Sequence, residues 1–141
     1  MADNYILLVE DNPDHEALTI RALKKAGLAN PVIVARDGAE ALGFLFGEKA
    51  LPELPQVVLL DLQLPKLDGL EVLQRLRREE RTHLTPVVVL TSSDEESDLV
   101  SSYRLGANSY IRKPVNFIQF VEATRQLGLY WLVLNEAPPG T

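Results

Sequence analysis

The chain contains no cysteine, and its 141 residues do not need a disulfide, since a domain of this size buries roughly two-thirds of its unfolded surface. The absence of disulfides agrees with a cytoplasmic location. No apolar run reaches the ~18 residues that a membrane-spanning helix needs. The first residues lack the basic segment that precedes the apolar part of a signal peptide. We therefore expect a cytoplasmic protein without a membrane segment.

Basic residues are also in the minority, because 14 lysines and arginines face 20 acidic residues and the net charge is −6. This balance argues against a general nucleic-acid surface, and we expect no direct DNA binding. The sequence shows no internal repeat, linker or low-complexity segment. We expect one domain over residues 1–141, with a core at about 4–134 and a C-terminal tail at 135–141.

The segment at 56–69, QVVLLDLQLPKLDG, organises the rest of the chain. After Gln56, residues 57–60 form an apolar run that is too short for a helix and does not alternate, as expected of a parallel strand buried on both faces. The run ends in Asp61. Ligands of open α/β sheets lie beyond the carboxyl ends of the strands, so this carboxylate is predicted to lie where chemistry occurs.

Three further apolar runs and one short, more polar segment, as expected of a strand at a sheet edge, alternate with amphipathic segments. Strands are expected at residues 5–9, 31–35, 56–60, 86–90 and 109–112, and helices at about 14–27, 39–46, 70–80, 95–105 and 117–134. Asp14 is the expected N-cap of the first helix and Asp37 that of the second. This alternation predicts an open, doubly wound parallel sheet with helices on both faces, since a closed barrel would need eight such units.

Polar side chains end the expected strands: Glu10 and Asp11 the first, Asp61 the third, Thr91 the fourth and Lys113 the fifth. If the first and third strands are neighbours, three carboxylates converge, and their mutual repulsion favours a bound cation. The oxygen ligands suit Mg²⁺. Neither His15 nor His83 lies at a strand end, so zinc is not indicated. A nucleophilic carboxylate, a cation and a hydroxyl are the components of phosphoryl transfer.

Four motifs occur in order at the ends of these strands: VEDN at 9–12, LDLQLPKLDG at 60–69, LTS at 90–92 and YIRKP at 110–114. In these motifs the chain resembles the CheY-like receiver domains of two-component response regulators, over nearly its whole length. The resemblance implies the strand order 2-1-3-4-5. It also implies that Asp61 accepts a phosphoryl group from a histidine kinase, with Asp11, Asp61 and the backbone carbonyl of Gln63 on Mg²⁺ and Glu10 acting through water.

The same resemblance assigns Thr91 and Lys113 to the phosphoryl group and makes Tyr110 a rotameric switch that responds to it. A protein of this kind assists its own phosphorylation and dephosphorylation but is not an enzyme with an external substrate. A phosphatase of the haloacid-dehalogenase type is a weaker alternative, because it needs a second acid at the position of Gln63. An interaction module with an inactive site is another, yet both Asp61 and Lys113 are retained.

A finer resemblance is to stand-alone receivers that are paired with bacterial phytochromes. It depends on the long loop at 47–55, on LQLP at 62–65 and on GLYWL at 128–132. It implies that the kinase is a phytochrome. We also expect no output domain, because 141 residues leave no room for one beyond the receiver. The protein would then signal through conformational change and protein contact, or by passing the phosphoryl group onward.

Four apolar residues lie off the face that the last expected helix turns to the core: Ile118, Leu129, Tyr130 and Leu132. Contiguous exposed apolar surface marks an interaction site, so we predict a two-fold dimer through this helix and the edge strand that carries Tyr110. Two alternatives stay open. The terminal segment could fold back over these residues, or the face could be reserved for the kinase.

Overall fold

The computed structural model describes residues 5–48, 50–92, 95–112, 118, 119, 122, 125 and 126. Its strands are β1 (Ile6–Val9), β2 (Val32–Ala35), β3 (Val57–Leu60), β4 (Val87–Thr91) and β5 (Ser109–Arg112). Its helices are α1 (Pro13–Lys25), α2 (Gly38–Phe46), α3 (Gly69–Arg78) and α4 (Glu96–Arg104). Each of these elements was expected from the sequence, within a few residues at its ends.

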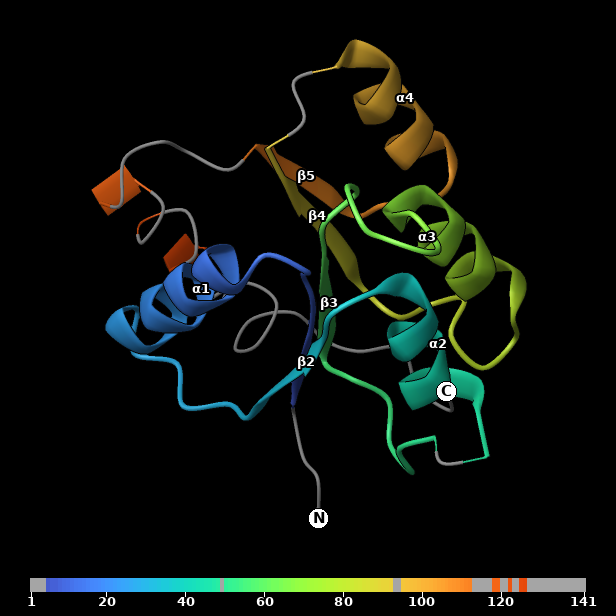
Figure 1. The fold of residues 1–141 in the computed structure, drawn as a ribbon, viewed down its shortest axis with the longest axis horizontal. Coiled ribbons are helices and arrows are strands. Elements are labelled where there is room, and N and C mark those ends of the chain that lie inside the picture. Colours follow the sequence, from blue (N-terminus) through green and yellow to red (C-terminus); the bar gives the residue numbers. More distant parts are fainter. Residues whose placement is uncertain are drawn as a thin grey trace.

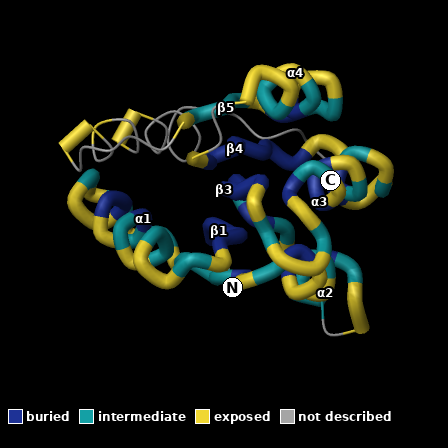
Figure 2. The backbone as a smooth tube through the Cα atoms, turned by 45° about the horizontal axis from the view of Figure 1, so that its top comes forward, coloured by how far each residue is buried: buried dark blue, intermediate teal, exposed yellow. Residues whose placement is uncertain are grey.

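The five strands form one parallel sheet in the order β2-β1-β3-β4-β5, which confirms the predicted topology. Helix α1 lies on one face of the sheet, and α2 and α3 lie on the other (Figure 1). Figure 2 shows the buried strands β1, β3 and β4 between α1 on one side and α2 and α3 on the other. The carboxyl ends of the central strands therefore open at one edge of a sheet that is covered on both sides.

Alternate residues of the central strands enter two separate hydrophobic clusters. Ile6 and Leu8 of β1 pack with Leu23 of α1, whereas Leu7 and Val9 pack in the cluster that contains the apolar sides of α2 and α3. Burial on both faces explains why these strands are continuously apolar instead of alternating. It also sets the direction of each side chain at the strand ends.

The N-cap of α1 is Asn12, so the prediction of Asp14 was wrong. The Asn12 side chain accepts hydrogen bonds from the backbone N–H groups of Asp14 and His15, at 2.9 and 3.1 Å. Pro13 occupies the first helical turn, where its missing N–H has no intrahelical partner to lose. The cap of α2 is Asp37, as predicted. The expected last helix, together with Lys113, Leu129, Tyr130 and Leu132, lies almost wholly outside the described residues.

The loop between α2 and β3 is held by two long side chains. The Tyr5 hydroxyl donates a hydrogen bond to the carbonyl of Glu53 at 2.7 Å, and Arg81 donates to the carbonyl of Leu51 at 2.8 Å. Burial raises the pKa of Tyr5 to about 12, so this hydroxyl remains a donor at neutral pH. Among the described helices, none is both long enough and apolar enough to cross a bilayer.

Two glycines provide a test of packing around Asp61. A Cβ at Gly69 would meet the carbonyl oxygen of Asp61 and the Cα of Leu62, whereas a Cβ at Gly43 would meet nothing within 4 Å. We expect Gly69→Ala to lower the free energy of unfolding by ~2 kcal/mol through overpacking. The exposed helical substitution Gly43→Ala should raise it by ~0.5–1 kcal/mol. Urea denaturation measures both, and a Gly69→Ala variant as stable as the parent would contradict the close packing of α3 on Asp61.

Candidate functional site

The site lies where β1 and β3 end. The N–H of Glu10 donates to the carbonyl of Ala35 at 2.9 Å, and the N–H of Asp61 donates to the carbonyl of Val9 at 3.0 Å. Both residues thus continue the hydrogen-bonded ladder by one position beyond their strands. Strand alternation then directs their side chains to the face that Ile6 and Leu8 share, which α1 covers. The two carboxylates consequently face the same space.

Asp61 is held from β4 and from its own loop. Its Oδ1 accepts hydrogen bonds from the Thr91 hydroxyl at 2.8 Å and from the backbone N–H of Gln63 at 3.1 Å. Ser92 in turn donates to the Gln63 side-chain oxygen at 3.2 Å. Asp61 is only 5% exposed and Thr91 is fully buried. The hydroxyl that the sequence placed at this edge of the sheet is therefore bonded directly to the carboxylate.

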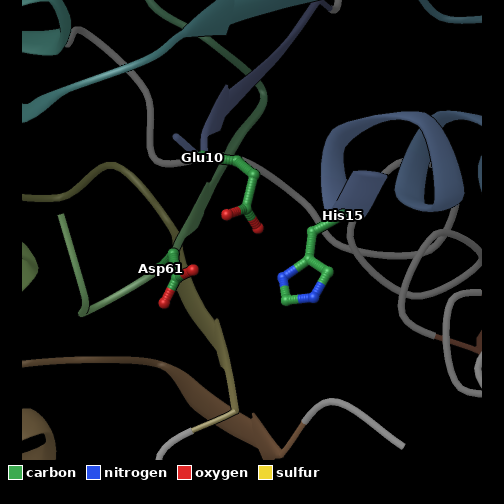
Figure 3. A group of neighbouring side chains, drawn as sticks. All are labelled: Glu10, His15 and Asp61. Atoms are coloured by element: carbon green, nitrogen blue, oxygen red, sulfur yellow. The ribbon is translucent and has the colours of Figure 1, made fainter. Parts of the chain in front are cut away.

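Three residues offer ligand atoms that all lie within 4.8 Å of one another: Glu10, His15 and Asp61. Figure 3 shows the two carboxylates and the imidazole ring of His15 around a common space. Glu10 is 1% exposed, and its Oε2 accepts the N–H of Asn12 at 3.3 Å. Asp11, which was predicted as a metal ligand, is exposed in the loop between β1 and α1 and does not belong to this group of three.

The donor atoms of this group fit a divalent cation. Two nearly buried carboxylates so close together repel each other in a medium of low polarity, and a cation between them removes that cost. Carboxylate oxygens suit Mg²⁺ and Mn²⁺, and an imidazole adds affinity for other transition ions. Glu10, His15 and Asp61 are therefore residues that could hold the metal.

The loop that follows Asp61 is fixed at both ends. The N–H of Gly69 donates to the carbonyl of Leu62 at 2.9 Å, and α3 begins with a capping box formed by Asp68 and Glu71. Within the loop, Lys66 adopts a positive φ of 67° and its amine lies 3.3 Å from Asp37. The backbone N–H of Glu40 and this amine hold the pKa of Asp37 below its usual range. The loop is thus tied to the start of α2.

The sequence comparisons agree with this geometry. The family model described as the response regulator receiver domain matches residues 6–125. The chain belongs to this family. As a receiver domain it is a signalling protein of two-component systems, and its sheet order is the one that the resemblance implied.

Among solved structures, the bacteriophytochrome response regulator AtBRR is 53% identical, with a TM-score of 0.74 over 94% of this chain and 98% of that protein. The phosphorylated cyanobacterial phytochrome response regulator RcpA is 38% identical, with a TM-score of 0.89 over 96% of this chain and 98% of RcpA. The Mn²⁺-bound response regulator Rcp1, a protein of Synechocystis, is 35% identical, with a TM-score of 0.85 over 96% of this chain and 99% of Rcp1. This receiver domain is therefore similar to phytochrome response regulators along nearly its whole length.

The receiver fold brings together Glu10, Asp61, Thr91 and Gln63, four residues that the sequence had selected. Tyr110 lies on the edge strand β5, partly buried against the larger core cluster. Lys113 falls outside the described residues. Sequence reasoning missed His15, which lies on the first turn of α1 and not at the end of a strand.

Proposed function

We propose that this receiver accepts a phosphoryl group on Asp61 from a histidine kinase and signals by a change of conformation. The observation that supports it best is the nearly buried Asp61 carboxylate, bonded to Thr91 and within 4.8 Å of Glu10 at the edge of the sheet. An Asp61 oxygen attacks the phosphorus of the phosphohistidine of the kinase, the P–N bond breaks and the imidazole leaves, while Lys113 neutralises the phosphoryl oxygens. Thr91 moves from Asp61 to the phosphoryl group, and Tyr110 occupies the space that it leaves.

A test of this function measures phosphate uptake and turnover separately. With Mg²⁺ and a small acyl phosphate donor, the protein should gain one phosphoryl group that hydroxylamine or base removes, as expected of an acyl phosphate. It should not hydrolyse phosphate esters through many turnovers. A protein that turns over esters would be a phosphatase, and one that takes up no phosphate would be an inactive interaction module.

The resident metal in this proposal is Mg²⁺, which neutralises phosphoryl oxygens when it is bound. Asp11, Asp61 and the carbonyl of Gln63 would hold it, and Glu10 would act through a bound water. We expect Mg²⁺ to stabilise the protein by ~1 kcal/mol at several times its Kd. Asp11→Asn should largely abolish the thermal shift that Mg²⁺ produces, with the exposed Asp14→Asn as the matched control. An unchanged shift in the Asp11 variant would assign the metal to other ligands.

The similarity to AtBRR, RcpA and Rcp1 supports a phytochrome as the partner kinase. We further propose that it is a stand-alone receiver over residues 1–141 that acts in the cytoplasm and contacts no DNA. Assistance by Thr91 and Lys113 would set the rates at which the protein gains and loses its own phosphoryl group. A downstream protein would then bind the surface that phosphorylation changes.

We also propose that the protein forms a two-fold dimer through Ile118, Leu129, Tyr130, Leu132 and the strand of Tyr110. Ile118 is 77% exposed, and β5 is an edge of the sheet. A stable dimer should bury at least ~1,000 Å². Sedimentation at micromolar concentration should show a dimer for the parent and a monomer for a Tyr130→Glu, Leu132→Glu double variant. A parent that stays monomeric with and without a phosphoryl analogue would rule the dimer out.

A further inference from the structure

Hydrogen bonds of the neighbouring Asn12 fix the position of His15 at the start of α1. The Asn12 side chain accepts the N–H of His15 and so fixes the start of α1, while the N–H of Asn12 donates to Glu10. Asn12 thereby connects the start of α1, which carries His15, to the carboxylate of Glu10. His15 is partly buried, and its ring lies beside Glu10 and Asp61.

The separation of the three ligand atoms suits a single ion. Opposite ligands of an octahedral ion with bonds of ~2.1 Å lie about 4.2 Å apart, and here no two of the three atoms are more than 4.8 Å apart. The three atoms are therefore close enough together for one ion to lie among them. Glu10 and Asp61 offer oxygen and the imidazole offers nitrogen, so His15 would add a nitrogen to the oxygen ligands that the proposed function assigns to the ion.

We propose that His15 is a nitrogen ligand of the divalent-ion site and that it shifts the preference of the site from Mg²⁺ toward first-row transition ions. This inference rests on the proposed function only in that the same site holds the ion. Mg²⁺ binds oxygen ligands and loses its water reluctantly, whereas imidazole binds Co²⁺, Ni²⁺ and Zn²⁺ well. Removal of the imidazole should therefore weaken the binding of these ions far more than the binding of Mg²⁺.

The chain has two histidines, and the second provides a matched control. His83 is exposed in the loop between α3 and β4, where its Nδ1 lies 2.8 Å from the carbonyl of Glu80. Calorimetric titration of the full chain with Co²⁺ and with Mg²⁺ gives a dissociation constant for each ion. The ratio of the Mg²⁺ constant to the Co²⁺ constant should fall at least ~10-fold in His15→Ala. The same ratio should be unchanged in His83→Ala.

A direct measurement of ligation uses ring-¹⁵N histidine and Zn²⁺, which is diamagnetic. Stoichiometric Zn²⁺ should shift the ring nitrogens of His15 and leave those of His83 in place. The proposal is overturned if the Mg²⁺ to Co²⁺ ratio is the same in the parent and in His15→Ala, if the His15 nitrogens do not move, or if the parent binds neither ion.

Phosphate uptake in Mg²⁺ separates this inference from the proposed function. A parent that is phosphorylated on Asp61 but has the same metal preference as His15→Ala is a receiver without a histidine ligand. A parent that shows the His15-dependent preference but takes up no phosphate has the metal site with its nitrogen ligand and lacks the proposed function.

Discussion

Phosphate uptake should fall at least ~100-fold when Asp61 is replaced by asparagine, because an amide is not a nucleophile toward phosphorus. The fold should survive the change, since an Asn oxygen still accepts the hydrogen bonds that Asp61 receives from Thr91 at 2.8 Å and from Gln63 at 3.1 Å. Intact-mass measurement after incubation with Mg²⁺ and an acyl phosphate donor gives the phosphorylated fraction. A parallel thermal melt shows that the variant is folded.

The matched control is Asp14→Asn, which makes the same chemical change at an exposed carboxylate on the first turn of α1. It should take up phosphate as the parent does. A base-labile phosphoryl group at full yield on Asp61→Asn would instead assign the acceptor to another carboxylate, and Glu10 would be the first to test, because it lies within 4.8 Å.

The fold was predictable because its elements leave local signals in the sequence. A parallel strand buried on both faces must be a short apolar run, as at 57–60, and an Asx residue before a helix predicts its cap, as at Asp37. The order of the strands required the resemblance to receivers. At the start of α1 the local signal was ambiguous, because Asn12 and Asp14 are both good caps, and the fixed φ of Pro13 favoured Asn12.

The site was predictable where it depends on strand ends and was missed where it depends on packing. Glu10 and Asp61 follow apolar runs directly, so the sequence alone places them at the carboxyl edge of the sheet. The ring of His15 reaches them only because α1 packs on the face where these two side chains point. A helix that starts three residues after Glu10, combined with the alternation of residues 6, 8 and 10, was the signal that could have identified it.

Arg77 links the end of α3 to two segments, the one that precedes β4 and the one between α4 and β5. It donates to the carbonyls of Gly106 at 2.9 Å and Thr85 at 2.8 Å, and to the Asn108 side chain at 2.9 Å. Asn108 in turn accepts the N–H of Val87, the first residue of β4, at 2.8 Å. One guanidinium therefore holds the beginning of the strand whose other end carries Thr91.

Arg77→Ala should lower the free energy of unfolding by ~2–4 kcal/mol, because it removes several charge-assisted hydrogen bonds and leaves their acceptors without this donor. Arg77→Lys should lose most of the same stability, since an ammonium cannot reproduce the planar fork that reaches carbonyls on two segments. The neighbouring Arg78 is exposed, and Arg78→Ala should stay within ~0.5 kcal/mol of the parent. Urea denaturation of the three variants decides the point. An Arg77→Ala variant that unfolds at the same urea concentration as Arg78→Ala would show that water replaces the guanidinium at no cost, and that β4 is positioned by sheet pairing alone.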